Sequence, residues 1–416
     1  TMARIRLVAV MAALALIASA CSAARSADTT TTSTTVGSRP ATTTPGTTGS
    51  GGSVDSEIED RIDELIIEAQ QLRGLEFLEP VDVVLLTDEE YQARFDQIIE
   101  EDLAEEDVQA TNALLRVLGI IGPQDDFREL VETLYSAGTG GFYDPETEEL
   151  VVRLIGGDFG PYAESVVVHE LVHALQDQHF ELSDERSDLD GDPYYVATAI
   201  MEGDALLREA TFVQAMSLAD QARYVGDISS IDLSALDALP GYIVNSFQAV
   251  YLDGFMFHQR IRLDEIDGQF LDPPESSEQL LDADSYRRNE QPREVTLPDY
   301  EIPGYEVWFD APAGQKDLEL LLTDGVPTND AIEAAQGWGG DWNRVYNARD
   351  EDAVYVLSYL GDSKADAEQL ADAFNEYIDA MVPPEAYTLV ERDEDAVLVI
   401  IASDPAIGPD LAEAFS

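Results

Sequence analysis

The sequence contains little cysteine, lysine or histidine. Its 416 residues include one cysteine, Cys21, and four histidines, while lysine occurs only at Lys316 and Lys364. A single cysteine cannot pair within the chain, so the fold must be stable without a disulfide. Acidic residues outnumber basic ones by 84 to 23, giving a net charge of −61. This balance excludes a general nucleic-acid binder, because too few cations are present to neutralise phosphates. It indicates a solvated acidic shell, as in proteins adapted to salt.

Long apolar runs are also scarce, and the clearest one lies near the N-terminus at residues 7–18. Arg4 and Arg6 precede this run, which is too short to span a bilayer reliably, and small residues then lead into Cys21. The pattern resembles a bacterial lipoprotein signal, in which the cysteine becomes the lipidated first residue of the mature chain. We therefore expect residues 1–21 to be such a signal and Cys21 to anchor the protein to the outer face of the membrane. The alternative is an ordinary cleaved signal and a secreted protein.

The remaining chain divides by composition. Residues 22–54 are almost all Thr, Ser, Gly, Ala and Pro, which cannot bury enough surface to offset the cost of ordering, so they predict a flexible tether. Apolar residues recur at helical spacing from about residue 55 onward. A proline-rich stretch at 272–303 indicates a boundary. We expect a core at 55–305 and a C-terminal α+β module at 306–416.

The predicted fold class is α+β. Period-2 and helical patterns alternate along the core, and in the module short strands alternate with one helix. The predicted strands are 81–86, 140–143, 150–154, 354–359, 387–391 and 396–401. The main predicted helices are 162–180, one that begins at 192, 242–263 and 365–381.

The segment His169-Glu170-Leu171-Val172-His173 carries the chemistry. Residues four apart lie on one face of a helix, so His169 and His173 can bind one metal ion. Glu170 is turned by about 100° from His169, which lets its carboxylate reach a water without binding the metal. A zinc ion at such a site lowers the pKa of water to about 7, and a carboxylate then accepts the proton. The pattern predicts Zn²⁺ as the cofactor.

Two sources of a third protein ligand are open. His179 lies ten residues after His169, the metzincin spacing, but that pattern needs a glycine at its eighth position, where this chain has Gln176. An unbroken helix would turn His179 away from the metal. The other source is an acid on the next helix. Glu202 lies in an apolar stretch where an unpaired carboxylate would be costly, and Gly203 suggests close approach to the active-site helix.

Two neighbours of Glu202 are alternatives to it. Glu209 or Asp204 could supply the third ligand. Asp204 could instead orient a ligating histidine without binding the metal itself. Glu202 remains the preferred prediction.

These motifs resemble a group of bacterial secreted or lipoprotein zinc metallopeptidases of the gluzincin kind. The resemblance is carried by the His-Glu-Leu-Val-His helix, by Glu-Gly-Asp-Ala at 202–205, and by segments at 141–145, 251–254, 273–279 and 337–341. It implies a zincin-like, mostly helical core with a small sheet. It also implies His169, His173 and Glu202 as zinc ligands, Glu170 as the general base, and a strand at 141–143 that pairs with an extended peptide.

A peptidase also needs a donor to the oxyanion, and Tyr251 and His258 are the candidates because they lie seven residues apart on one helix face. The sequence thus predicts a surface-anchored zinc peptidase whose partners are peptide or protein substrates. The alternatives are a metzincin-type site that uses His179 and a non-catalytic surface lipoprotein with the same fold.

Overall fold

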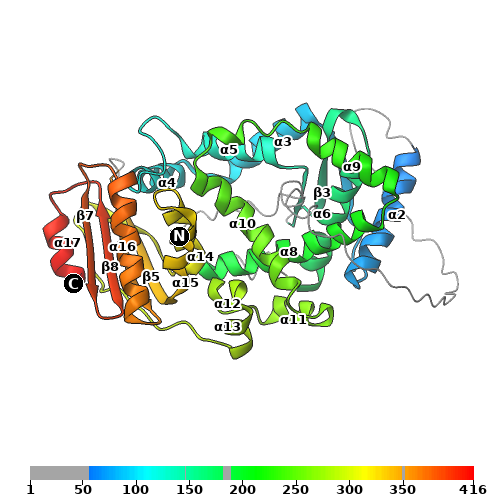
Figure 1. The fold of residues 1–416 in the computed structure, drawn as a ribbon. Helices are drawn as coiled ribbons and strands as arrows, with labels where there is room; N and C mark the ends of the chain where they lie inside the picture. The colour runs from blue at the N-terminus through cyan, green and yellow to red at the C-terminus, as the bar shows by residue number, and fades with distance from the viewer. Residues whose placement is uncertain (1–55, 146, 181–188, 349–351) are drawn as a thin grey trace.

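The computed structural model describes residues 56–145, 147–180, 189–348 and 352–416 (Figure 1). The expected signal, Cys21 and the tether lie outside these residues. The fold is α+β, as predicted, with one small sheet beside the long helices and a larger sheet near the C-terminus. Within the described residues, no helix is both long and apolar enough to cross a membrane.

The elements of the predicted core follow in chain order. They are α2 (Ser56–Arg73), β1 (Asp82–Thr87), α3 (Asp88–Asp102), α4 (Glu105–Val117), α5 (Phe127–Gly138), β2 (Gly141–Asp144), β3 (Glu149–Leu154), α6 (Pro161–Phe180), α8 (Gly191–Ala215), α9 (Leu218–Ser230), α10 (Gly241–His258), α11 (Ile266–Leu271), α12 (Ser277–Leu281) and α13 (Ala283–Arg288). Short 3-10 turns lie at Ile155–Gly157, Leu236–Ala238 and Leu263–Glu265.

The small sheet has the order β1-β3-β2, with β1 parallel and β2 antiparallel to β3. Because side chains alternate between the faces of a strand, each strand contributes to two cores. Phe142 and Val151 pack with the aromatic residues of α3, whereas Tyr143 and Leu150 pack against α6. The sheet therefore lies between α3 and α6, with β2 at its edge.

Helix α6 is the central helix of this part of the molecule. It begins at Pro161, where a proline costs no backbone hydrogen bond. Nearly every residue from there to Gln176 is buried, because β2, β3, α2, α8 and α9 all pack on it. Such a helix is apolar on all sides, so the polar residues that it does carry stand out.

Helices α8 and α10 touch through their backbones. A Cβ atom on Gly203 would lie 2.1 Å from the carbonyl carbon of Gly254, and one on Gly254 would lie 1.7 Å from the Ala199 oxygen. The expectation that Gly203 permits close approach to the active-site helix α6 was therefore wrong. The close approach is to α10, because the side of α8 that carries Ala199 and Gly203 faces Gly254 of α10.

The C-terminal part is built on a five-stranded antiparallel sheet of order β4-β5-β6-β8-β7. Its elements are β4 (Tyr305–Ala311), α14 (Gly314–Thr323), α15 (Thr328–Gln336), β5 (Trp338–Ala348), β6 (Ala353–Gly361), α16 (Lys364–Met381), β7 (Tyr387–Asp393), β8 (Ala396–Ala402) and α17 (Gly408–Phe415). The strands predicted at 354–359, 387–391 and 396–401 and the helix at 365–381 are confirmed, whereas β4, β5, α14, α15 and α17 were not predicted.

One hydrophobic cluster crosses the expected boundary at 305/306. Ala113 and Leu115 on α4 share it with Leu357 on β6 and Phe374 on α16. The Tyr377 hydroxyl also donates a hydrogen bond to the Leu118 carbonyl at 2.8 Å. Helix α4 therefore completes the core of the C-terminal sheet (Figure 1).

Candidate metal centre

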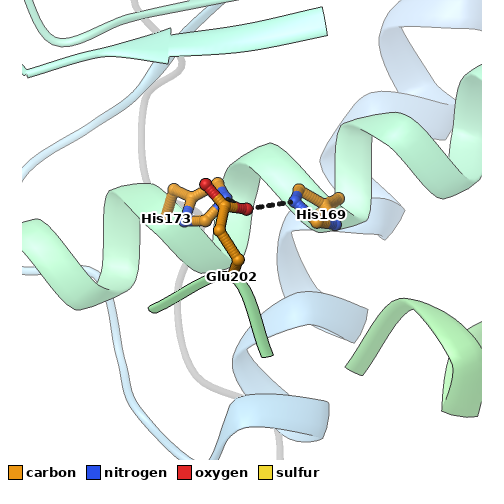
Figure 2. Close-up of side chains that lie close together, drawn as sticks. All are labelled: His169, His173 and Glu202. Atoms are coloured by element: carbon orange, nitrogen blue, oxygen red, sulfur yellow. Dashed lines mark ion pairs between the residues drawn. The ribbon is translucent and has the colours of Figure 1, made fainter. Parts of the chain in front are cut away.

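Three side chains from α6 and α8 converge on one point. His169 and His173 lie one turn apart on α6, with ring centroids 4.7 Å apart. The Glu202 Oε2 atom of α8 lies 3.4 Å from His169 Nε2 and 3.2 Å from His173 Nε2. Figure 2 shows the Glu202 carboxylate reaching the two imidazoles from the facing helix. The structure thus brings the three predicted ligands together, each at most 3% exposed.

The donor set fits a zinc ion. One ligand atom from each of the three residues lies within 4.8 Å of the others. His169 Nε2, His173 Nε2 and Glu202 Oε2 are buried; they lie within ion-pair distance of one another but make no hydrogen bond. Unpartnered buried polar atoms are costly, and two imidazole nitrogens with one carboxylate oxygen form the ligand set of catalytic zinc. A metal ion at this point would satisfy all three atoms.

The charges of the ligands are coupled when no metal is bound. Burial alone would lower the pKa of His169, but Glu202 and Glu209 outweigh it and raise that pKa to about 10. Burial alone would raise the pKa of Glu202, but His173 and His169 lower it to about 2. An ionised Glu202 thus faces a protonated His169. A metal ion held by His169 would have to displace that proton, because only the neutral imidazole binds metal.

Glu170, the predicted general base, is buried beside the candidate ligands. Its side chain is 1% exposed, and neither carboxylate oxygen has a hydrogen-bond partner. Burial raises its pKa to about 7, although His169 and His173 oppose the shift. A base with a pKa near neutral is well matched to proton transfer at physiological pH.

The sheet edge approaches the site at Gly141. A Cβ atom there would lie 2.7 Å from both the Val151 carbonyl oxygen and Val166 Cγ1 of α6, and 3.4 Å from Glu170 Cγ. Glycine is required because β2 passes too close to α6 for any side chain. The edge strand of the small sheet therefore runs beside the predicted base.

The second nitrogen of each histidine has its own partner. His169 Nδ1 lies 3.2 Å from Glu209 Oε2, and His173 Nδ1 lies 3.0 Å from Gln176 Oε1. These contacts orient both rings so that the Nε2 atoms face Glu202. Glu209, which the sequence left open as a third ligand, therefore lies behind His169.

Asp204, the other acid left open, also lies behind the ligands. It accepts a hydrogen bond from Gln176 and pairs with Arg73 and Arg208. Burial raises the pKa of Asp204, but the two arginines outweigh it and leave that pKa below its ordinary value.

The structure separates the two candidates for the oxyanion donor. The Tyr251 ring lies 6.3 Å from that of His169, and burial with nearby Glu202 raises the pKa of its phenol well above the ordinary value. The phenol therefore keeps its proton and can donate it in a hydrogen bond.

His258 does not join the site, although it lies on the same helix. Its Nε2 atom lies 2.8 Å from the Ile200 carbonyl, and its charged neighbours are Asp204, Arg208 and Arg73. Burial lowers the pKa of His258, which favours the neutral ring. The expectation that His258 serves the reaction is corrected: its hydrogen bond to α8 gives it a structural role.

His179 does not lie with the other two histidines of α6 either. The helix continues without a break to Phe180, and His179 Nε2 lies 2.8 Å from the Glu76 carbonyl. Without a turn after Gln176, the third histidine cannot return to the metal. The geometry is not that of the metzincin alternative.

Sequence reasoning missed the residues behind the ligands: Gln176, Arg73 and Arg208. Two signals could have found part of this set, since Gln176 follows His173 by three residues and Arg208 follows Asp204 by four. Arg73 comes from a distant helix and has no local signal.

A second acidic group lies elsewhere in the described residues. Glu278, Glu290 and Asp362 bring one oxygen each within 4.8 Å. Glu278 accepts a hydrogen bond from Ser285, and Glu290 pairs with Arg288. These existing partners and the exposed Asp362 do not distinguish the group from an ordinary surface cluster.

Among known protein families, a match is found for the C-terminal part of the chain. Residues 303–410 match a family described as a domain of unknown function (DUF8575). No curated protein matches the chain. The matched segment runs from just before β4 into α17, and the residues of the metal centre lie outside it.

Proposed function

We propose that this protein is a zinc-dependent peptidase with His169, His173 and Glu202 as metal ligands and Glu170 as general base. The observation that carries the proposal is the set of unpartnered buried atoms. Three ligand atoms face one another without hydrogen bonds, and the adjacent carboxylate of Glu170 has no partner either. A fold does not retain four such groups at one point without a use for them.

The chain's residues divide the chemistry among them. When bound, zinc would supply a Lewis acid that polarises a peptide carbonyl and lowers the pKa of water. Glu170 accepts a proton from the attacking water and passes it to the leaving amine. The Tyr251 phenol, buried beside Glu202, donates a hydrogen bond to the carbonyl oxygen as it gains charge.

The edge strand supports a peptide as the substrate. β2 lies at the edge of its sheet, and Gly141 lets it run beside Glu170. An extended peptide that pairs with such an edge would have its backbone held in register beside the base. The wide acidic excess of the chain would favour cationic peptides at low salt.

The proposal is tested first by the zinc content of the purified chain after dialysis against metal-free buffer. We expect about one zinc per chain, as one His-His-Glu site requires. His173→Ala and Glu202→Ala should lose the metal, whereas the matched variant His179→Ala should keep it. A folded chain that refuses added zinc would overturn the proposal. Loss of zinc in His179→Ala with retention in Glu202→Ala would favour the metzincin arrangement.

We also propose that the enzyme acts outside the cell, anchored through a lipid on Cys21. This follows from the signal-like N-terminus, which lies outside the described residues. Labelling with a radioactive fatty acid should mark the wild-type chain and not Cys21→Ser. Equal labelling of both, or of neither, would contradict the anchor.

A further inference from the structure

Lys316 is one of only two lysines in the chain, and it is buried where the two parts of the molecule meet. It lies in the first turn of α14, which contacts α8 and α10 of the core as well as β5 of the C-terminal sheet (Figure 1). Its side chain is 10% exposed, whereas that of Lys364, the other lysine, is 65% exposed. A lysine is rarely buried unless it is paired, so its partners at this position deserve a description.

The Lys316 ammonium has two carboxylate partners. Its Nζ atom lies 3.1 Å from Asp253 Oδ2 on α10, and it donates at 2.9 Å to Glu319 Oε1, one turn along α14. The same Asp253 oxygen accepts a 2.6 Å hydrogen bond from the Tyr195 hydroxyl on α8. We call these four residues the Lys316 cluster. Through one oxygen of Asp253, the cluster joins α8, α10 and α14.

The two donors of the cluster keep their protons. Burial lowers the pKa of Lys316, but Asp253 and Glu319 outweigh it and raise that pKa above its ordinary value. Burial and the neighbouring Asp253 raise the pKa of the Tyr195 phenol well above its ordinary value. A compact ammonium can also direct separate N–H groups at two carboxylates, whereas a planar guanidinium matches one carboxylate best. The geometry thus suits a lysine in a chain whose other cations are almost all arginine.

The cluster lies beside the closest contact between α8 and α10. On α10, Asp253 directly precedes Gly254. On α8, Tyr195 precedes Ala199 by four residues and Gly203 by eight, so it lies on the stripe that touches Gly254. Glycine and alanine let two backbones approach but have no long side chains that interlock. The backbone contact therefore fixes the distance between the helices, and the hydrogen bond from Tyr195 to Asp253 fixes how they are aligned along their axes.

Helices α8 and α10 carry two sides of the proposed active site. Glu202 lies on α8, and Tyr251 lies on α10 two residues before Asp253. We propose that Lys316 is a positioning residue that holds Asp253 against Tyr195 and so keeps the Tyr251 phenol aligned with Glu202. The C-terminal part would then serve the site although it supplies none of the proposed ligands. The effect on catalysis rests on the proposed function, but the hold of Lys316 on α10 does not.

The first test is amide hydrogen exchange in the full chain carrying Lys316→Met. Methionine keeps much of the side chain's length, but without the ammonium the carboxylates of Asp253 and Glu319 face each other as like charges. We expect the amides of α10 to exchange about 10-fold faster than in the wild type. The matched control is Lys364→Met, which removes the exposed lysine that pairs with Glu394 and should leave α10 unchanged. Wild-type exchange rates in Lys316→Met, or equal acceleration in both variants, would overturn the proposal.

A second variant, Tyr195→Phe, keeps the test decisive if Lys316→Met does not fold. It removes one hydroxyl and no charge, so the fold should persist. The loss of the hydrogen bond to Asp253 should speed exchange in α10 by about 3- to 10-fold. Unchanged exchange in folded Tyr195→Phe would show that the cluster does not align the two helices.

Steady-state kinetics of the zinc-loaded chains separates positioning from a general loss of structure. We expect kcat for a cleaved peptide to fall about 10- to 100-fold in Lys316→Met, because a displaced phenol no longer meets the charge that develops on the substrate. KM and zinc content should stay near their wild-type values, and Lys364→Met should match the wild type in all three. Loss of zinc from folded Lys316→Met, or a rise in KM with unchanged kcat, would contradict the positioning role.

A double-mutant cycle with Tyr251→Phe tests whether Lys316 acts through the phenol. Once the phenol is gone, Lys316→Met should lower the residual kcat little further, because two changes on one interaction are not additive. Losses that multiply independently would overturn the positioning role. If the zinc-loaded wild type cleaves no peptide, the proposed function fails. Hydrogen exchange then decides alone: faster exchange of α10 in Lys316→Met supports the hold on that helix, and unchanged exchange overturns it.

Discussion

Two buried carboxylates show how the two parts of the molecule differ. Asp341 on β5 is 4% exposed, and it accepts hydrogen bonds from the Trp338 indole and from the Ala313 and Gly314 amides. Glu170 on α6 is 1% exposed, and neither of its oxygens has a partner. Both oxygens of Asp341, in the C-terminal sheet, are thus satisfied. The core around α6 leaves both oxygens of Glu170 unsatisfied beside other ionisable groups, which is the arrangement expected of the proposed active site.

The largest expected effect is on catalysis, from Glu170→Gln. The amide keeps the shape of the side chain but cannot accept the proton of water, so peptide cleavage should fall about 10²- to 10⁴-fold. Zinc content and the free energy of unfolding should not fall, because the change removes an unpartnered buried acid. A peptide-library assay with elemental analysis of the same sample measures both. Unchanged cleavage by the variant would exclude Glu170 as the general base, and no cleavage by either zinc-loaded chain would leave a non-catalytic metal-binding lipoprotein as the better description.

The next largest effect is on stability, from Phe374→Ala in α16. Phe374 is fully buried in the cluster that joins α16, α4 and the C-terminal sheet. Its removal should lower the free energy of unfolding by about 3–5 kcal/mol, measured by urea denaturation. The exposed neighbour Glu376→Ala on the same helix should change it by no more than about 0.5 kcal/mol. Loss of zinc from folded Phe374→Ala would show that the two parts are less separate than their cores indicate.

A smaller effect is expected from Asp341→Asn, the counterpart of Glu170→Gln. The amide nitrogen cannot accept from the donors that surround Asp341, so unfolding should become easier by about 1–3 kcal/mol. Cleavage per folded molecule should stay at the wild-type level. If the acid-to-amide change were harmless here and destabilising at position 170, the contrast between the two acids would be reversed.

The smallest expected effect is on how the free energy of unfolding changes with pH, and it comes from Asp192→Asn. Asp192 lies where the two parts of the molecule meet. Burial raises the pKa of Asp192 to about 7, well above its ordinary value of 3.8, although the bond from Ser277 opposes the shift. Between these pH values the native chain keeps a proton that the unfolded chain has lost, so stability falls as pH rises. Asparagine does not titrate, and the variant should lose this part of the slope. Parallel urea midpoints for both chains from pH 5 to pH 8 would contradict the shifted pKa.

The meeting of the two histidines was predictable from sequence because their spacing is local. The spacing of His169 and His173 fixes their common face, and Pro161 with the absence of glycine predicts the helix that carries them. Glu202 could be proposed because an acid in an apolar stretch needs a partner. Contacts between distant helices have no such local signal, which is why the partner of Gly203 was predicted wrongly.

The C-terminal sheet was predicted only in part, for a related reason. Strands β6, β7 and β8 alternate or repeat β-branched residues, whereas β5 begins with Trp-Gly-Gly-Asp, a composition typical of turns. Its pairing with β4 and β6 overrides that local preference. The contribution of α4 to the core of this sheet could not be read from either segment alone.

The contact between Gly203 and Gly254 has a consequence for how this site can change over time. Glu202 and Tyr251 each lie within three residues of that contact, so the spacing between the proposed ligand and the Tyr251 phenol is set by main chain packed against main chain. Side-chain packing can adjust by small steps, a methyl group at a time. A contact between two backbones cannot, because the first added carbon at either position would force the helices apart. Substitutions around the site can therefore accumulate gradually, but this spacing can be altered only by a shift of a whole helix.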